Sequence, residues 1–243
     1  MYGWRGRFGH VSPAIHDVQN FEYAQLLPEG VMVVTTTLNV QNLVEAEFER
    51  AFAMMEQGAL SLAREEVGAI IIGGGPIFSF KGVGSHQNII DAVYTKTGIP
   101  TSTTVSASMD ALKSLGVRRL VVATPWVSER NEAHCRYLED SGFEVLATKG
   151  LGITRNADIT RVPFHGSYRL AVEVFHQAKG VEAVYITCPR WPVVGNIDSL
   201  EKDLGVPVVC DIQAVTWFAL KSLGIREQIK GYGTLLERPE SLK

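Results

Sequence analysis

The sequence predicts an α/β fold made of two pseudo-symmetric lobes, each a parallel sheet flanked by helices. The first observation is that short apolar runs alternate with segments of helical period, which is the pattern of βαβ units. The second is that the strand-like runs are apolar throughout, as expected when helices cover both faces of a parallel sheet. The third is that landmarks of the first half of the chain recur in the second.

Most of the expected strands are short runs rich in Val, Ile or Leu, and each expected helix carries apolar residues three or four positions apart. The strands, in chain order, are Phe8–Ser12, Val31–Thr36, Ala69–Ile72, Leu120–Ala123, Val184–Thr187 and Val206–Cys210. The clearest helices are Leu43–Glu65, Ser106–Leu115, Arg130–Ser141 and Tyr168–Ala178.

The repeat is visible in matched stretches of the two halves. Gly98-Ile-Pro and the later Ala111–Arg118 recur as Gly205-Val-Pro and Ala219–Arg226. A strand ending in Ser-Pro or Thr-Pro precedes them in each half, followed by one ending in Gly-Pro or Cys-Pro. This order predicts an internal duplication, with residues 1–104 and 212–243 forming the first lobe and residues 105–211 the second.

The strand ends identify a candidate active site in the crevice between the lobes. Ligands of open α/β sheets bind outside the carboxyl ends of the strands. If the lobes face each other, four strand-end motifs converge there: Ser12-Pro13, Gly75-Pro76, Thr124-Pro125 and Cys188-Pro189.

Cys188 is the candidate catalytic residue. The repeat matches it to Gly75, so only one of the two strand ends carries a thiol. A single thiol can transfer a proton on one face of a substrate or act as a nucleophile. The alternative is a structural cysteine, because free cysteine is among the most buried residue types.

The neighbouring residues are candidates for substrate binding. Pro76 and Pro189 have no backbone N–H, so an oxyanion bound in the crevice would depend on other hydrogen-bond donors. The candidates are the N–H groups of Ile77, Cys188 and Arg190 and the hydroxyls of Ser12, Thr124 and Thr187. Arg190 is a candidate carboxylate clamp or a solvated surface arginine, and Trp126 a pocket wall or a core residue. The complete set of expected binding residues is Ser12, Pro13, Gly74, Gly75, Pro76, Ile77, Thr124, Trp126, Thr187, Pro189 and Arg190. His16 and His86 follow strand ends and are weaker candidates.

Composition limits the partners. The net charge of −3 argues against nucleic acid or an acidic membrane surface. No run approaches the roughly 18 apolar residues of a membrane span, and the first residues lack the apolar core of a signal peptide. The three cysteines are scattered, so we expect a cytoplasmic protein with no disulfide and no metal site. The GGGPIFSFKG run lacks the spacing of a phosphate-binding loop.

The chain resembles the aspartate/glutamate racemase superfamily, and within it the branch of arylmalonate decarboxylase and maleate cis–trans isomerase. The stretches that carry the resemblance are Arg7–Pro13, Gly68–Gly75 with Phe78–Phe80, Gly98–Pro100, Leu115–Pro125, Leu151–Ile153, Ile186–Cys188 and Leu204–Val209. The resemblance implies the two-lobed fold, a small carboxylic-acid substrate and no metal or organic cofactor. A homo-oligomer is left open.

The resemblance also bears on the reaction. Racemases and maleate isomerases of the superfamily carry a cysteine at both strand ends, whereas the decarboxylase has only the second, as in this sequence. We therefore expect a cofactor-independent decarboxylase of a malonate-type acid, in which Cys188 protonates an enediolate. The alternatives are a cis–trans isomerase of a small acid, with Cys188 adding to the substrate, and a small-acid-binding protein without catalysis. The sequence departs from the decarboxylase pattern at Pro76, Ile77, Trp126 and Pro189, where most of the decarboxylase's oxyanion-binding groups are absent.

Overall fold

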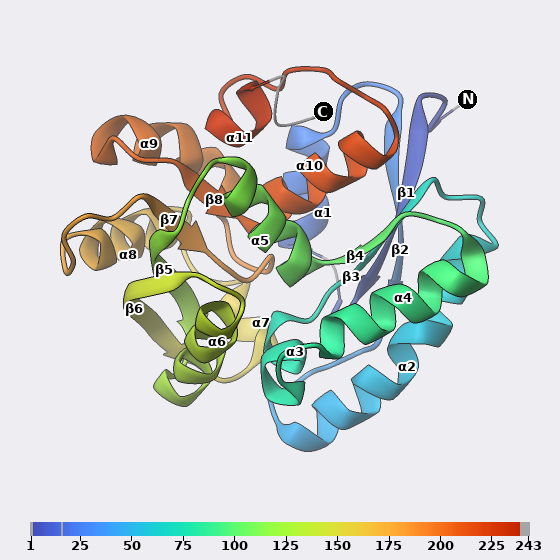
Figure 1. Ribbon diagram of the computed structural model, residues 1–243, viewed down its shortest axis with the longest axis horizontal. Coiled ribbons are helices and arrows are strands. Elements are labelled where there is room, and N and C mark those ends of the chain that lie inside the picture. Colours follow the sequence, from blue (N-terminus) through green and yellow to red (C-terminus); the bar gives the residue numbers. More distant parts are fainter. Residues whose placement is uncertain (1, 16, 239–243) are drawn as a thin grey trace.

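Two four-stranded parallel sheets, one from each half of the chain, form the framework of the molecule (Figure 1). The computed structural model describes residues 2–15 and 17–238. The first sheet has the order β2-β1-β3-β4 and the second the order β6-β5-β7-β8, so the two halves repeat the same topology. The strands are β1 (Gly6–Ser12), β2 (Val31–Thr37), β3 (Ala69–Ile72), β4 (Thr101–Thr103), β5 (Arg119–Trp126), β6 (Glu144–Ile153), β7 (Ala183–Ile186) and β8 (Val208–Cys210). The predicted fold class is confirmed.

Helices cover the faces of both sheets, as the apolar strands require. The first half contains α1 (Val18–Leu26), α2 (Glu45–Ala63), α3 (Gly75–Lys81) and α4 (Ser85–Thr97). The second contains α6 (Ser128–Asp140), α7 (Asn156–Ile159), α8 (His165–Phe175), the short 3-10 helix η1 (Val194–Asn196) and α9 (Ile197–Leu204). The two halves end in α5 (Thr104–Ser114) and α10 (Asp211–Ser222), and α11 (Thr234–Glu237) follows.

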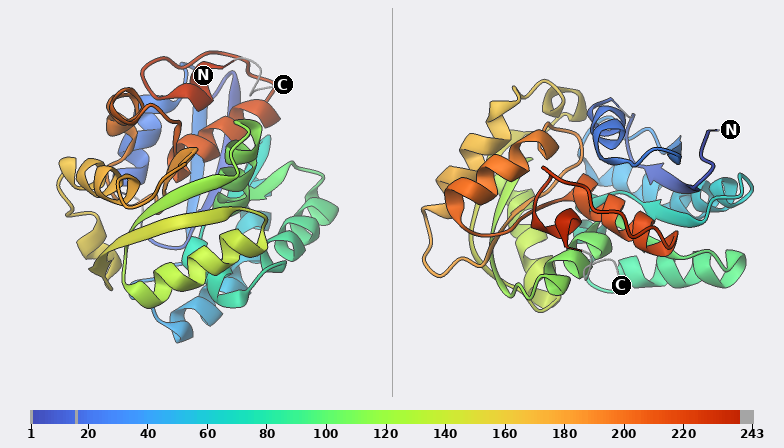
Figure 2. Two further views of the ribbon diagram at one scale, coloured as in Figure 1. Left: turned by 60° about the vertical axis from the view of Figure 1, so that its left-hand side comes forward. Right: turned by 90° about the horizontal axis from the view of Figure 1, so that it is seen from above.

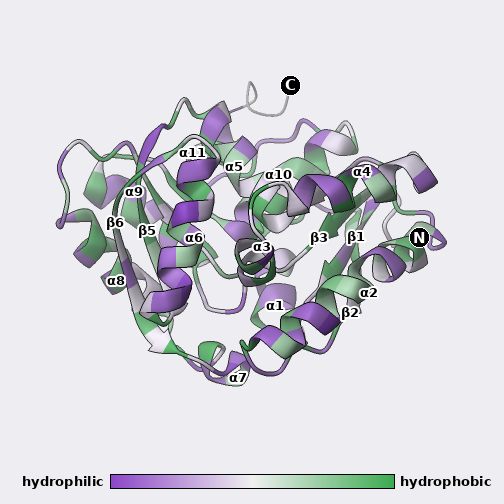
Figure 3. Cartoon of the chain, turned by 60° about the horizontal axis from the view of Figure 1, so that its bottom comes forward, coloured by the Kyte–Doolittle hydropathy of each residue, from purple (hydrophilic) through white to green (hydrophobic). Residues whose placement is uncertain are grey.

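Hydrophobic burial explains the arrangement of layers. Every residue of β3 and β7 is buried, because both strands lie inside their sheets. One face of helix α2 is buried, and it includes Phe48, Met55 and Leu62. The helix packs on β1, β2 and β3. Figure 3 shows the same division, with hydrophobic residues on the strands and hydrophilic residues on the outer helices. None of the helices within the described ranges is long and apolar enough to cross a membrane.

Helices α5 and α10 lie between the two sheets (Figure 2) and pack against each other. Helix α5 contacts β4 and β8, and α10 contacts β8 and β3, so each helix reaches the opposite lobe. Both carry the repeated Ala-Leu-Lys-Ser-Leu-Gly sequence, whose glycines end them: Gly116 and Gly224 have φ values of 76° and 69°. The repeat predicts a first lobe of residues 1–104 with 212–243 and a second lobe of residues 105–211. These boundaries stay a prediction.

The strand registers correct one detail of the repeat. Gly73 donates its N–H to Val11 next to β1, and Thr187 donates to Ala123 in the same position next to β5. The residue that follows is Gly74 in the first lobe and Cys188 in the second. Cys188 therefore corresponds to Gly74, and the match with Gly75 was wrong by one residue. Both positions have positive φ, 129° at Gly74 and 82° at Cys188.

Candidate active site

A pocket lies where the carboxyl ends of β1, β3, β5 and β7 meet, as expected for the crevice. Ten of the twelve residues predicted for the site line it: Ser12, Pro13, Gly74, Gly75, Pro76, Ile77, Trp126, Cys188, Pro189 and Arg190. Thr124 and Thr187 do not line it and are fully buried. The convergence of the four strand ends follows from the pairing of the two lobes.

Seven further residues line the pocket, and none was predicted from the sequence. They are Ala14, Gln19, Val40, Leu43, Phe48, Asn156 and Asp211. Val40, Leu43 and Phe48 follow the end of β2 and form, with Ile77, an apolar wall. Val40 and Leu43 could have been located from the end of β2, because this strand also ends at the edge of the sheet where β1 and β3 end.

The Cys188 thiol is enclosed. The residue is 6% exposed, and its backbone N–H donates to Asp211 Oδ2 at 2.8 Å. Burial raises the pKa of the thiol to about 12, although hydrogen bonds from the Arg190 backbone and the Trp126 side chain lower it in part. With its pKa raised in this way, the thiol keeps its proton at neutral pH, and the residue lines the pocket.

Asp211, the first residue of α10, supports the loop that carries Cys188. Its carboxylate accepts four hydrogen bonds, from Ser108 at 3.0 Å, Tyr185 at 2.6 Å, Thr187 at 3.1 Å and the Cys188 N–H. Burial raises the pKa of the Asp211 carboxyl and the four donors oppose the rise. The arrangement fixes the end of β7 against α10.

Most of the oxyanion donors expected from the sequence already donate within the protein. The backbone N–H groups of Ile77 and Cys188 donate to Gly74 and Asp211. The hydroxyls of Ser12, Thr124 and Thr187 donate to Ala14, Asn131 and Asp211. The N–H of Arg190 donates to the Cys188 sulfur. An anion in this pocket would have to be held by other groups.

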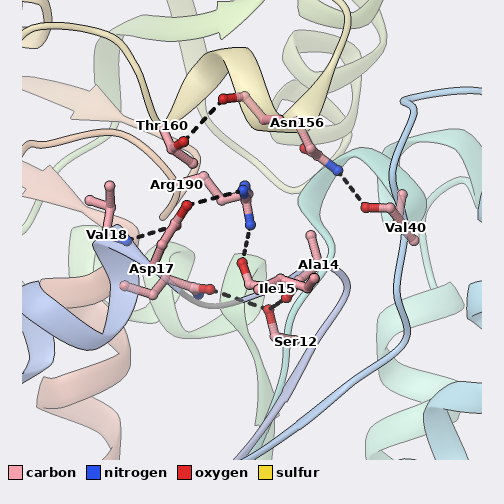
Figure 4. A network of polar contacts seen from close by, with 11 residues as sticks. Ser12, Ala14, Ile15, Asp17, Val18, Val40, Asn156, Thr160 and Arg190 are labelled. Atoms are coloured by element: carbon pink, nitrogen blue, oxygen red, sulfur yellow. Dashed lines mark hydrogen bonds and ion pairs between the residues drawn. The ribbon is translucent and has the colours of Figure 1, made fainter.

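Arg190 lines the pocket and is only 8% exposed, and its role as a carboxylate clamp stays a prediction. Its guanidinium donates to the Ile15 carbonyl and pairs with Asp17 Oδ2 at 3.5 Å (Figure 4). Asn156 donates its amide to the Val40 carbonyl at 3.0 Å, which ties the two lobes beside the pocket (Figure 4).

Of the two weaker histidine candidates, only His86 lies within the described residues. His86, on α4, bonds to Tyr137 and is absent from the lining. His16 lies outside the described residues. Within the described ranges, no three His, Cys, Asp or Glu side chains are grouped to hold a metal ion.

Two matched lobes that share one thiol-bearing pocket define the class expected from the sequence, a two-lobed enzyme of the aspartate/glutamate racemase superfamily. The family model for arylmalonate decarboxylase matches residues 9–236, and the chain belongs to that family.

Individual relatives agree with this assignment. The chain is 24% identical over 230 residues to the arylmalonate decarboxylase of Bordetella bronchiseptica, covering 94% of this chain and 95% of that protein. It is 22% identical over 244 residues to the maleate isomerase of Pseudomonas putida, covering 95% and 96%. A crystal structure of an arylmalonate decarboxylase mutant in the liganded form has the same fold, with a TM-score of 0.90, 22% identity and coverage of 96% of this chain and 99% of that chain.

Proposed function

We propose that this protein is a cofactor-independent decarboxylase of a malonate-type, 2-substituted dicarboxylic acid. The observation that carries the proposal is the single protonated thiol of Cys188, which corresponds across the lobes to a residue without a side chain, Gly74. One carboxylate leaves as carbon dioxide, and its bonding electrons remain as an enediolate on the retained carboxylate. The thiol then gives its proton to the α-carbon from one face, and solvent restores the proton of the sulfur.

The apolar wall supports the first step. Val40, Leu43 and Phe48 contribute apolar side chains to the lining, which offer no hydrogen bond to a carboxylate placed against them. A carboxylate is poorly solvated against this wall, whereas neutral carbon dioxide needs no such solvation. The wall therefore favours conversion of the leaving carboxylate to carbon dioxide.

An isomerase is the second candidate, because several relatives are maleate isomerases. Addition of Cys188 to a double bond needs the thiolate. Because burial raises the pKa of the thiol to about 12, the thiolate is scarce at neutral pH. This observation favours proton donation over nucleophilic addition.

The partner and compartment follow from the same proposal. Relatives named for arylmalonate and maleate support a small carboxylic acid as the substrate. All three cysteines are unpaired, which supports a reducing cytoplasm.

The test is incubation with malonates, maleate and 2-substituted acids in deuterated water, followed by NMR. We expect carbon dioxide release with one deuterium on the α-carbon, and at least a hundredfold loss of turnover in Cys188→Ala. Cys135→Ala, which removes a buried thiol from α6 outside the pocket, is the matched control and should keep wild-type turnover. Full activity of Cys188→Ala contradicts the mechanism, and geometric isomerisation without carbon dioxide release favours the isomerase.

A further inference from the structure

Asp211 contributes a carboxyl group to the pocket lining, and both oxygens of that group are already occupied. The residue is 3% exposed. Oδ1 accepts from the hydroxyls of Ser108 and Tyr185, and Oδ2 accepts from the Thr187 hydroxyl and the Cys188 N–H. An ionised carboxyl group has about four lone-pair positions, so these four donors saturate it. Asp211 is therefore not free to take a proton from a substrate.

The same four donors favour the ionised form of Asp211. A carboxylate only accepts hydrogen bonds, whereas a protonated carboxyl group must also donate one, and the Cys188 N–H cannot accept it. Burial opposes the charge, but the donors replace the water that the carboxylate has lost. A fixed negative charge thus lies beside the residue that carries the thiol, since Asp211 Oδ2 is 2.8 Å from the Cys188 nitrogen.

The charge acts on the thiol because both groups are buried, where charges interact more strongly than in water. Burial is the larger cause of the raised pKa of the Cys188 thiol, and the negative charge of Asp211 adds to it. Arg190, in the same loop, has the opposite effect through its positive charge and its backbone N–H. The protonation of the sulfur therefore depends on the balance between Asp211 and Arg190.

The other titratable groups around this pair are buried and uncharged at neutral pH. They are Tyr23 on α1, His134 on α6, Tyr185 on β7 and Cys210 at the end of β8. Burial raises the pKa of the two phenols and of the Cys210 thiol and lowers the pKa of His134, so each keeps its neutral form. Helix α5 contributes Ser108, which does not titrate.

We propose that Asp211 is a positioning residue of the reaction, whose buried carboxylate fixes the Cys188 loop and returns the sulfur to its protonated form after each turnover. This inference rests on the proposed decarboxylation. Conversion of a dicarboxylate to carbon dioxide and a monocarboxylate consumes one proton, which Cys188 gives to the α-carbon and solvent returns to the sulfur. A thiolate beside the Asp211 carboxylate is destabilised by the like charge, so it takes up a proton from solvent and does not persist as a nucleophile.

Titration of the Cys188 thiol in Asp211→Asn tests the inference. The asparagine is nearly isosteric: its carbonyl oxygen can accept from the Cys188 N–H while its amide donates to the hydroxyl oxygens of Ser108 and Tyr185. The ultraviolet absorbance of the thiolate is followed as pH rises, and the same titration of each protein with Cys188→Ala is subtracted. We expect the midpoint to fall by at least one pH unit, which is a tenfold rise in thiolate at a given pH.

Two further variants separate charge from packing. Asp198→Asn removes the same charge from the surface of α9 and should titrate as the wild type does. Asp211→Glu keeps the charge but changes the geometry, so turnover should fall while the thiol midpoint stays as high as in the wild type. If Asp211→Asn does not fold by circular dichroism, Asp211→Ser removes the charge with a smaller side chain. An unchanged midpoint in the neutral variant, or an equal fall in Asp211→Glu, overturns the inference.

The outcomes also separate this inference from the proposed function, because the titration needs no substrate. Decarboxylation that depends on Cys188, with a thiol midpoint indifferent to Asp211→Asn, contradicts the role of Asp211 alone. A midpoint that falls in Asp211→Asn, in a wild-type protein that decarboxylates no malonate, contradicts the proposed reaction and leaves the control of the thiol by Asp211 in place.

Discussion

Cys188 has a backbone conformation that is strained for a residue with a side chain. Its φ of 82° lies in the left-handed region, where a side chain is strained by roughly 1–2 kcal/mol. The corresponding position in the first lobe is Gly74, which adopts positive φ without that strain. Four hydrogen bonds to Asp211, one of them from Cys188 itself, hold the strained turn. Strain retained at a pocket residue is consistent with a thiol that has a function.

The strain gives an unusual order of stability for two variants. A protein with alanine at a given position is normally more stable than one with glycine. At position 188 we expect the opposite order, with Cys188→Gly more stable than Cys188→Ala by roughly 1 kcal/mol, because only glycine adopts this φ without strain. Urea unfolding of the two proteins measures the difference. Neither variant should turn over substrate. Greater stability of Cys188→Ala would show that the turn is not strained by its side chain.

At the residue scale, the position of the candidate thiol could be predicted from the sequence better than its surroundings. Cys188 and Arg190 follow a recognisable buried strand, so their place at the pocket could be predicted. Gln19 and Asp211 could not, because each lies in a helix with no motif and reaches the pocket only through the tertiary arrangement. Thr124 and Thr187 were expected as donors because they end strands, but their hydroxyls turn toward Asn131 and Asp211.

At the scale of elements, the apolar strands could be predicted and the polar ones could not. β1, β2, β3, β5, β7 and the end of β8 match the expected runs to within a few residues. β4 is Thr-Ser-Thr, which has no hydrophobic signal, and in β6 the apolar residues are interrupted by Thr148, Lys149 and two glycines. The one-residue error in matching Cys188 arose because Gly-Pro was aligned with Cys-Pro, whereas hydrogen bonds between strands set the true register.

The corrected register predicts different outcomes at two adjacent glycines. At Gly74, φ is 129° and an added Cβ would lie 3.0 Å from Met55 Cε, so we expect Gly74→Ala to destabilise the fold by about 1–3 kcal/mol. At Gly75 the nearest atom would be 3.4 Å away, an ordinary contact, so Gly75→Ala should change stability by less than about 1 kcal/mol. Thermal and urea unfolding provide the comparison, and equal effects would argue against the register.

At the scale of the whole molecule, the pocket depends on contacts that join the lobes. Glu22 of α1 accepts hydrogen bonds from the backbone N–H groups of Val193 at 2.6 Å and Val194 at 2.8 Å, in the segment that follows Arg190. Near the pocket, the N–H of Leu43 also donates to the Thr154 carbonyl, at 3.4 Å. The same helix α1 carries the lining residue Gln19, so Glu22 fixes this helix to the segment that follows Arg190.

Glu22 should also make the stability of the molecule depend on pH. Burial raises the pKa of its carboxyl from 4.5 to about 7, although the two N–H groups oppose the rise, and Tyr23 and Cys210 are its titratable neighbours. Between pH 4.5 and 7 the folded protein keeps a proton that the unfolded chain releases, so stability falls as pH rises through this window. The loss in the free energy of unfolding is roughly 3 kcal/mol from this group.

Urea unfolding at pH 5, 6, 7 and 8 should show this fall in stability in the wild type and a much shallower fall in Glu22→Gln. Glu29→Gln, an exposed change of the same charge, should keep the wild-type slope. Equal slopes in the wild type and Glu22→Gln would show that Glu22 is already ionised in the folded protein at pH 5.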